Sequence, residues 1–254
     1  MRALITGAAT GIGASTVSKL KTSGYEVVAL DIAEPTNVDQ WVSVDMSNTE
    51  SIDSAVAQLS GNFDCMINNA GLPPRAGLEE TILAVNYLGL VRFTQATLQF
   101  MNKNAAIVNT ASRAGAMWRN NLEEVKALMK LSAPSELAEF IEAHNVDHIR
   151  AYNLSKEAVI VWTMAQTQKM IGLKLRMNSV SPAAVSTGIL DDFAAAFGDK
   201  MTKNVERVGR PGTAEEIADL ILFLCSNQSH WIKGQDLVID GGMSALGQVD
   251  MLEL

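Results

Sequence analysis

Tyr152 and Lys156 stand four positions apart in a segment with helical spacing, so both side chains point from one face of a helix. A free phenol titrates near pH 10 and is a poor base at neutral pH. A nearby ammonium group favours the phenolate and lowers the phenol pKa. The phenol then donates a proton to a ketone oxygen or accepts one from an alcohol. On the pair alone, a surface cation beside an aromatic ring remains the alternative interpretation.

A glycine-rich turn provides a second chemical signal near the N-terminus. It reads Gly7-Ala8-Ala9-Thr10-Gly11-Ile12-Gly13 and lies between an expected strand and an expected helix. Glycines there allow a tight turn and a close approach to a pyrophosphate, which binds the free N–H groups of the helix N-terminus. The spacing differs from the commoner G-x-G-x-x-G, and a purely structural turn is the alternative. The strand–turn–helix context favours dinucleotide binding.

Asp31 ends the second expected strand, 31 − 13 = 18 residues after Gly13. A carboxylate at that point accepts hydrogen bonds from the ribose hydroxyls of NAD and repels the additional phosphate of NADP. Neither Ile32 nor Ala33 offers a cation to such a phosphate, and neither does Thr10 in the turn. We therefore predict NAD as the cofactor, with a capping or solvated aspartate as the alternative.

The elements that must position these residues alternate between short apolar strands and helices along the whole chain. Continuous apolar strands indicate a parallel sheet covered on both faces, which predicts a single-domain, doubly wound α/β fold of Rossmann type over 1–254. The expected strands are Ala3–Thr6, Glu26–Asp31, Trp41–Asp45, Phe63–Asn68, Ala105–Thr110, Arg176–Val180 and Asp236–Ile239. The expected helices are Ile12–Thr22, Ser51–Leu59, Leu83–Met101, Arg150–Ile171 and Ala214–Cys225.

Two segments depart from this alternation. Residues 116–149 have no strand signal and contain two amphipathic patterns, Leu122–Leu131 and Ser135–Ala143, which predict a helical insertion packed outside the sheet. Residues 186–210 predict a helical lid over a substrate pocket, with an apolar inner face formed by Ile189, Leu190, Phe193 and Phe197. Met117 and Trp118 are expected to form the opposite wall, unless these apolar residues only pack the insertion.

Composition excludes several functional classes. Acidic residues exceed basic ones by 28 − 20 = 8 and no basic cluster occurs, which argues against a nucleic-acid partner. Cys65 and Cys225 lie in apolar runs and are expected to be buried thiols. His144, His148 and His230 match no metal pattern, so we predict no metal. The N-terminus has no signal-peptide pattern and no apolar run is long enough to span a membrane, so we expect a cytoplasmic protein.

In combination, these motifs make the chain resemble the short-chain dehydrogenase/reductase family over essentially its whole length. The matching residues are Thr6-Gly7-x-x-x-Gly11-Ile12-Gly13, Asp45, Asn68-Asn69-Ala70-Gly71, Asn86, Ser112, Tyr152-x-x-x-Lys156, Ser181-Pro182 with Thr187, and Asp240-Gly241-Gly242. The resemblance implies an oxidoreductase that interconverts an alcohol and its aldehyde or ketone by hydride transfer, with a tyrosine general acid/base.

The resemblance also implies a role for each catalytic residue. Tyr152 is expected to be the acid/base, and Ser112 to hydrogen-bond the substrate oxygen and stabilise a developing alkoxide. Lys156 is expected to hold the nicotinamide ribose and to lower the Tyr152 pKa. Asn86 is expected to hold a water molecule that connects the lysine to a proton relay.

The implied cofactor contacts extend along the chain. Besides Gly7, Thr10, Gly11, Ile12, Gly13, Asp31, Tyr152 and Lys156, they comprise Asp45 and Met46 at the adenine, Asn69, Ala70 and Gly71 beneath the adenine ribose, and Val185 and Thr187 at the carboxamide and pyrophosphate.

The sequence departs from the family pattern at three places. Ala183 replaces the usual glycine after Pro182, and Ala111 replaces a second serine before Ser112. Ser112 and Tyr152 are 40 positions apart, which is much farther than is usual. An insertion there resembles those of bacterial 3α-hydroxysteroid dehydrogenase/carbonyl reductases, and the helix motifs resemble those of bacterial coniferyl alcohol dehydrogenases.

That subgroup resemblance predicts an apolar, ring-bearing substrate, either a coniferyl-type alcohol or a hydroxysteroid. It also predicts a homodimer formed through Ala214–Cys225 and the last strand, because the insertion would cover the surface that family members usually employ; a tetramer is the alternative. Two other functions remain open: an enzyme of the same fold with epimerase or dehydratase chemistry, and a non-catalytic NAD(H)-binding protein.

Overall fold

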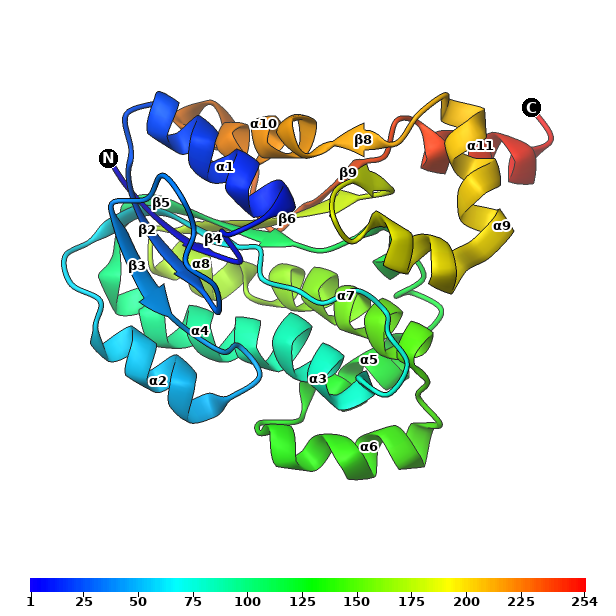
Figure 1. Cartoon of the computed structure of the whole chain (residues 1–254), viewed down its shortest axis with the longest axis horizontal. Helices are drawn as coiled ribbons and strands as arrows, with labels where there is room; N and C mark the ends of the chain where they lie inside the picture. The colour runs from blue at the N-terminus through cyan, green and yellow to red at the C-terminus, as the bar shows by residue number, and fades with distance from the viewer.

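A seven-stranded parallel sheet forms the centre of the molecule (Figure 1), in a computed structural model that describes residues 1–254 except for the side chain of Lys200. The strand order is β3-β2-β1-β4-β5-β6-β9. The strands are β1 Arg2–Thr6, β2 Glu26–Asp31, β3 Gln40–Ser43, β4 Phe63–Asn68, β5 Met101–Thr110, β6 Arg176–Pro182 and β9 Asp236–Ile239. The predicted doubly wound α/β fold is confirmed, since the order reverses direction between β1 and β4.

The strands β1 and β2 are buried on both faces because most of their side chains are apolar. Ala3–Thr6 of β1 pairs in register with Val27–Leu30 on one side and with Cys65–Asn68 on the other. The apolar side chains of β1 and β2 between these bounds are fully buried. Such continuous burial requires helices on both faces of the sheet.

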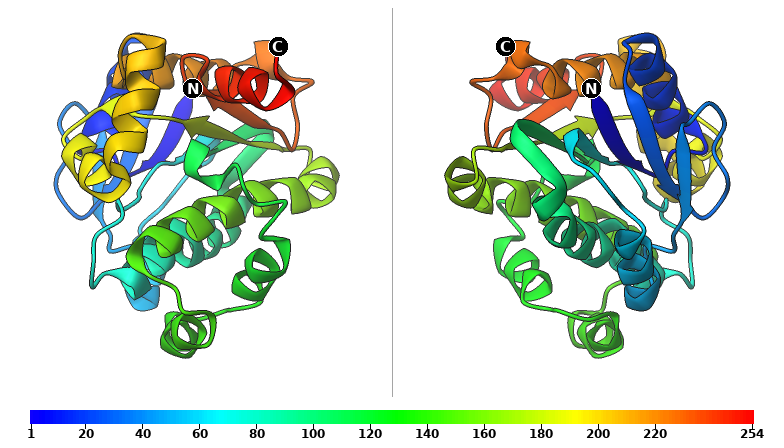
Figure 2. Two further views of the ribbon diagram at one scale, coloured as in Figure 1. Left: turned by 90° about the vertical axis from the view of Figure 1, so that its right-hand side faces the viewer. Right: turned by 90° about the vertical axis from the view of Figure 1, so that its left-hand side faces the viewer.

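Helices cover both faces in two layers. Figure 1 shows α1 and α10 along one face of the sheet and α2, α4 and α7 along the other, and Figure 2 shows the same layers end-on. The helices are α1 Gly11–Thr22, α2 Thr49–Ala57, α3 Glu79–Leu83, α4 Leu90–Thr97, α5 Leu122–Met129, α6 Leu137–His144, α7 His148–Ala165, α8 Thr167–Gly172, α9 Leu190–Val208, α10 Ala214–Cys225 and α11 Met243–Leu252. Of the described helices, none is both long and apolar enough to cross a membrane.

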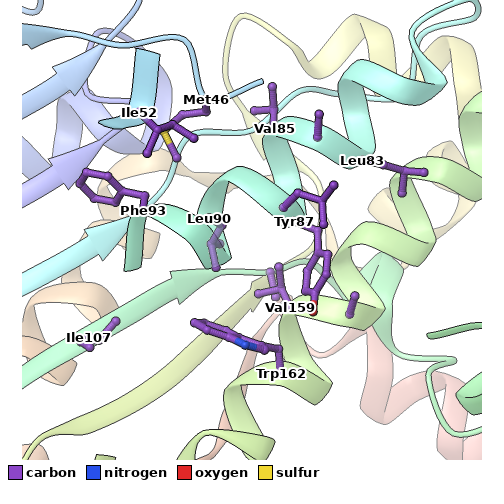
Figure 3. Close-up of a cluster of buried hydrophobic side chains, with 14 of the residues drawn as sticks. Met46, Ile52, Leu83, Val85, Tyr87, Leu90, Phe93, Ile107, Val159 and Trp162 are labelled. Atoms are coloured by element: carbon purple, nitrogen blue, oxygen red, sulfur yellow. The ribbon is translucent and has the colours of Figure 1, made fainter. Parts of the chain in front are cut away.

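The larger apolar core lies between the sheet and the layer of α2, α4 and α7. Figure 3 shows part of it, with Phe93 and Leu90 of α4 near Ile107 of β5, and with Val159 and Trp162 of α7 close by. These side chains are almost completely inaccessible to solvent. The core therefore fixes α7, the helix that carries Tyr152 and Lys156, against the sheet.

Residues 116–149 contain α5 and α6, which pack on α7 and α3 respectively. A partly buried ion-pair network joins α5 to α7: Arg150 donates to Glu124 and to Glu157, each at 2.7 Å. Asn121 also donates to the Glu157 carboxylate, at 2.7 Å. The carboxylate of Glu157 is fully enclosed, so these partners are needed to compensate its desolvation.

Several local features differ from the sequence expectations. The expected helix Leu83–Met101 contains a π-helical turn, Ala84–Gly89, and the expected helix Arg150–Ile171 is interrupted at Gln166. A two-stranded sheet pairs β7 Val185–Ser186 with β8 Gly212–Thr213. The chain also ends in α11, a helix that was not predicted from the sequence.

Candidate active site

A cleft of about 640 Å³ opens at the carboxyl ends of the strands, on both sides of the point where the strand order reverses. Its described lining residues are Gly7, Thr10, Gly11, Ile12, Leu30, Asp31, Ile32, Val44, Asp45, Met46, Ser47, Asn69, Ala70, Gly71, Leu72, Thr81, Val85, Thr110, Ala111, Ser112, Tyr152, Lys156, Pro182, Ala183, Val185, Thr187, Gly188, Ile189 and Phe193. Of the candidate site residues, Gly13 and Asn86 are not in this lining. Ligands of doubly wound sheets bind at this position.

The glycines of the first turn are required by close packing. Gly7 has a φ of +67°, and a Cβ added to it would lie 2.5 Å from the Cα of Ala70. A Cβ at Gly13 would lie 1.8 Å from the carbonyl oxygen of Gly7, so only glycine allows the start of α1 to pack this closely on the turn. Gly11 has a φ of +54°, and a Cβ there would meet the side chain of Thr187 at 3.3 Å.

Hydrogen bonds join this turn to the segment after β4. The hydroxyl of Thr6 accepts from the backbone N–H groups of Asn69 and Ala70, at 3.1 and 3.2 Å. The Asn69 amide in turn donates to the carbonyl oxygen of Gly7 at 2.8 Å. The two segments therefore form one rigid floor for the cleft, which explains the presence of Thr6, Gly7 and Asn69 in the two motifs.

The N-terminus of α1 faces the cleft with its N–H groups free. Thr10 is the N-cap residue, and among the described side chains none caps the helix by a hydrogen bond. The first turn carries no acidic residue. Free N–H groups at the positive end of a helix dipole suit a phosphate group.

Asp31 accepts two backbone hydrogen bonds at the edge of the cleft. Its Oδ2 accepts from the N–H of Ala9 at 2.9 Å, and its Oδ1 accepts from the N–H of Ala33 at 3.1 Å. Each oxygen retains a lone pair for a ribose hydroxyl. Asp45 has a similar arrangement, since its Oδ1 accepts from both the N–H and the hydroxyl of Ser47. The cleft thus presents carboxylate oxygens that can accept hydrogen bonds from the hydroxyl and amino groups of a nucleoside. These residues therefore fit a dinucleotide.

Tyr152, Lys156 and Ser112 meet at the other end of the cleft. The Lys156 Nζ lies 5.8 Å from the centroid of the Tyr152 ring and donates to the carbonyl oxygen of Thr110 at 2.9 Å. The Ser112 hydroxyl accepts from the N–H of Ala114, and this holds the serine at the start of a 3-10 turn that packs on α7. The spacing of Y-x-x-x-K places both groups on one helix face, as we expected.

Burial acts on the two ionisable groups in opposite directions. Desolvation raises the pKa of Tyr152 to about 12, and a hydrogen bond with Ser112 partly opposes this rise. Desolvation lowers the pKa of Lys156 to about 8. The expectation that the Tyr152 pKa is lowered is therefore wrong for this state of the protein, because the phenol is covered and the lysine charge is itself disfavoured.

Asn86 lies behind the cleft, in the π-helical turn. Its amide donates to the carbonyl oxygen of Leu72 at 3.0 Å and to the hydroxyl of Ser155 at 3.2 Å, while its oxygen accepts from the N–H of Leu72 at 2.7 Å. A Cβ at Gly71 would lie 3.3 Å from the Asn86 oxygen and 3.5 Å from the Lys156 Nζ. The absence of a side chain at Gly71 therefore leaves room for the side chains of both Asn86 and Lys156 beside it.

The start of α9 forms the wall above Tyr152. The Phe193 ring contacts the Tyr152 ring edge-on, with centroids 5.3 Å apart, and Ile189 lines the cleft beside it. The expected opposite wall is wrong: among the described lining residues neither Met117 nor Trp118 occurs, because Trp118 packs on the core and Met117 is exposed.

Leu72, Thr81 and Val85 line the cleft on the side of α3 and were not among the site residues predicted from the sequence. Only Val85 carried a signal, as the neighbour of Asn86. Leu72 lies in the loop between β4 and α3, and Thr81 lies in α3. Neither belongs to a sequence motif, so only the folded chain shows that they line the cleft.

With this geometry in place, the class of protein can be assigned from known sequences. Residues 1–123 match the profile described as short chain dehydrogenase, and residues 136–244 match the profile described as Enoyl-(Acyl carrier protein) reductase. The chain belongs to the short-chain dehydrogenase family, whose members similar to this chain include named dehydrogenases and reductases, and it is an oxidoreductase.

Individual relatives cover nearly the whole chain. A coniferyl-alcohol dehydrogenase from Pseudomonas sp. (strain HR199) is 35% identical over 95% of this chain and 96% of that protein. A 3-alpha-hydroxysteroid dehydrogenase/carbonyl reductase from Comamonas testosteroni is 30% identical over 96% of each. Among solved structures, the 3-alpha-hydroxysteroid dehydrogenase from Pseudomonas sp. B-0831 complexed with NADH superimposes with a TM-score of 0.87, at 28% identity, over 98% of this chain and 99% of that one.

Proposed function

We propose that this protein is an NAD-dependent alcohol dehydrogenase/carbonyl reductase in which Tyr152 is the general acid/base. The observation that carries the proposal is one continuous cleft, with the glycine turn and Asp31 at one end and Tyr152, Lys156 and Ser112 at the other. A dinucleotide bound along this cleft and an alcohol bound at the tyrosine would then meet.

The residues that would hold NAD follow from the cleft. The free N–H groups at Gly11, Ile12 and the rest of the α1 N-terminus would bind the pyrophosphate, and Asp31 would bind the adenine ribose. Asp45, Met46, Asn69, Ala70 and Gly71 would contact the adenosine half, and Val185, Thr187 and Lys156 the nicotinamide half. When bound, NAD supplies the hydride acceptor of the reaction. In support, the similar hydroxysteroid dehydrogenase from Pseudomonas sp. B-0831 was crystallised as a complex with NADH.

The protein's own residues manage the proton. In alcohol oxidation the Tyr152 phenolate accepts the hydroxyl proton, while the Ser112 hydroxyl donates a hydrogen bond to the substrate oxygen. Lys156 in its charged form favours the phenolate. Asn86, held by Leu72 and Ser155, would position a water molecule that returns the proton to solvent past Lys156. Reduction of a ketone uses the same groups in reverse.

The substrate is proposed to be an apolar, ring-bearing alcohol, either a coniferyl-type alcohol or a hydroxysteroid. Phe193 contacts the Tyr152 ring, and Leu72, Val85 and Ile189 are further apolar residues of the cleft lining, so a polar substrate would lose hydration without compensation. The names of the two curated relatives support these substrate classes.

We also propose a homodimer formed through α10 and β9. Because α5 packs on α7 and α6 on α3, the segment 116–149 covers part of the surface of the catalytic helix. By contrast β9 is an edge strand, on which Val238 is 50% exposed, and Trp231 nearby is 90% exposed. Exposed apolar side chains on an unpaired strand favour association with another chain.

Absorbance of reduced nicotinamide, followed with NAD and a panel of alcohols, tests the proposed function. The panel comprises coniferyl alcohol, a 3α-hydroxysteroid and simple secondary alcohols. Turnover of the ring-bearing alcohols above the simple ones is expected. NAD binding without turnover of any alcohol would instead favour an epimerase, a dehydratase or a non-catalytic NAD(H)-binding protein.

A further inference from the structure

An ion pair joins the loop between β4 and α3 to the start of α9, two segments that contribute Leu72 and Phe193 to the cleft lining. Arg75, in the loop between β4 and α3, donates from Nε to Oδ1 and from Nη2 to Oδ2 of Asp192, each at 2.8 Å. Asp192 lies in the first turn of α9, 117 positions farther along the chain. This two-bond geometry fixes the orientation of both partners, as well as their separation.

The aromatic residue beside Asp192 covers the proposed acid/base. Phe193 contacts the Tyr152 ring at a centroid distance of 5.3 Å and an interplanar angle of 67°, and Phe197 stacks on Phe193 at 6.4 Å. Tyr152 is consequently only 5% exposed. Because Asp192 and Phe193 are consecutive, the ion pair and the contact with Tyr152 hold the same turn of α9.

A break inside α9 separates this part from the rest of the helix. Gly198 has φ +51° and ψ −139°, which are not helical, and no described atom lies within 4 Å of the position of an added Cβ. Beyond the break, Arg207 donates to Asp250 of α11 at 2.6 and 3.0 Å. The two halves of α9 therefore have separate anchors, and the half at 190–197 is held at its start by Arg75.

We propose that Arg75 and Asp192 are positioning residues, which hold residues 190–197 closed so that Phe193 covers Tyr152 and excludes water from the reacting atoms. This inference rests on the proposed function, because it assigns the closed wall to the acid/base of that reaction. Exclusion of water strengthens the hydrogen bonds to a developing charge. The pair is partly exposed to solvent, with 52% of the Arg75 side chain accessible, so salt screens it and the wall opens readily for substrate exchange.

Single, double and control variants test the pair through amide hydrogen exchange, which does not depend on activity. In Arg75→Gln and in Asp192→Asn we expect residues 190–197 to exchange about threefold faster, as loss of a partly exposed ion pair allows, with 199–208 unchanged. The double variant should exchange no faster than either single variant. Arg92→Gln, which removes a similar two-bond pair with Asp53 outside the cleft lining, should leave 190–197 unchanged.

Kinetics then connect the pair to the reaction. We expect kcat/KM for alcohol oxidation to fall about threefold in each single variant, with the Kd for NAD unchanged, and high salt to remove the difference from wild type. The pH profile of oxidation should also move to lower pH, because a hydrated phenol ionises more easily. Unchanged exchange at 190–197, or additive effects in the double variant, would overturn the proposal. If wild type oxidises no alcohol while the exchange results hold, the proposed function fails and the closure by this pair stands.

Discussion

At the scale of single residues, the acid/base and its lysine neighbour are destabilised in their charged forms by the burial that the reaction needs. The Lys156 ammonium loses hydration when it is buried. Among the described atoms, it donates its hydrogen bond to the carbonyl oxygen of Thr110. Residues placed for catalysis commonly lower the stability of the fold. The free energy by which buried Lys156 destabilises the folded protein can be measured because it depends on pH.

Replacing Lys156 with Met should stabilise the protein at pH 7 while removing activity. Lys156 has a pKa of about 8 in the folded protein and an ordinary value of 10.5, so between these values the unfolded chain binds more protons. This difference in proton binding destabilises the folded wild type by about 3 kcal/mol below pH 8. Loss of the hydrogen bond to Thr110 in the variant offsets about 1 kcal/mol of the stability gained. Urea unfolding should show the variant about 2 kcal/mol more stable at pH 7, with the advantage fading between about pH 8 and 10. An advantage independent of pH would refute this account.

Asp31 is predicted to select NAD through its charge and to support the glycine turn through its hydrogen bond with Ala9. Asp31→Asn removes the charge and keeps an acceptor, whereas Asp31→Ala removes both. We expect both variants to lower the NAD-to-NADP ratio of kcat/KM at least about tenfold, since a like-charge repulsion is lost. Only Asp31→Ala should also weaken NAD binding. An unaltered ratio in both variants would show that Asp31 does not select the cofactor.

At the scale of elements, the sequence predicted the sheet well because burial on both faces leaves a continuous apolar signal. The strands Glu26–Asp31 and Phe63–Asn68 were predicted with the bounds that the structure has, and so was the edge strand Asp236–Ile239, although it is only partly buried. The π-helical turn Ala84–Gly89 was not predicted, since it has the same apolar spacing as the α-helix around it. The helix α11 was missed because its residues are only partly buried and its apolar spacing is weak.

The site was predictable where its residues belong to one local motif, such as Tyr152 with Lys156. Contacts between distant segments leave no signal in the sequence. The pair Arg75–Asp192 joins two segments 117 positions apart, and the packing of Trp118 into the core depends on how the segment 116–149 folds back on α7. The contact of Phe193 with Tyr152 also joins distant segments. Burial raises the pKa of Tyr152, where the sequence predicted a lowered pKa.

The 3-10 turn that follows Ser112 packs so closely on α7 that it tolerates no side chain at Gly115. A Cβ there would lie 2.8 Å from the carbonyl carbon of Lys156 and 2.9 Å from the N of Glu157. Gly115→Ala should therefore destabilise the protein by about 1–3 kcal/mol and lower kcat, because the turn must move Ser112 away from Tyr152. Thermal unfolding and kinetics check this. Gly172→Ala, where no described atom lies within 4 Å, is the control and should be neutral or slightly stabilising; equal behaviour of the two variants would contradict the packing argument.

At the scale of the whole molecule, the sheet ends on one side in the exposed strand β9, and the proposed homodimer would cover it. Val238→Lys places a charge on that strand and should convert the dimer to a monomer in light scattering at micromolar concentration. Ile171→Lys, a similar change at an exposed apolar residue of α8, should leave the dimer intact. A stable tetramer of the wild type, or a dimer unaffected by Val238→Lys, would count against this assembly.

Tyr152 is proposed to transfer the proton while the rest of the cleft binds the cofactor. Tyr152→Phe removes only the hydroxyl and keeps the ring that contacts Phe193. The measurement is the rate of coniferyl alcohol oxidation, or of oxidation of the best alcohol in the panel, together with the Kd for NADH from its fluorescence. We predict a rate lowered about 10²- to 10⁴-fold with the Kd within about twofold of wild type. A rate close to that of wild type would contradict the mechanism.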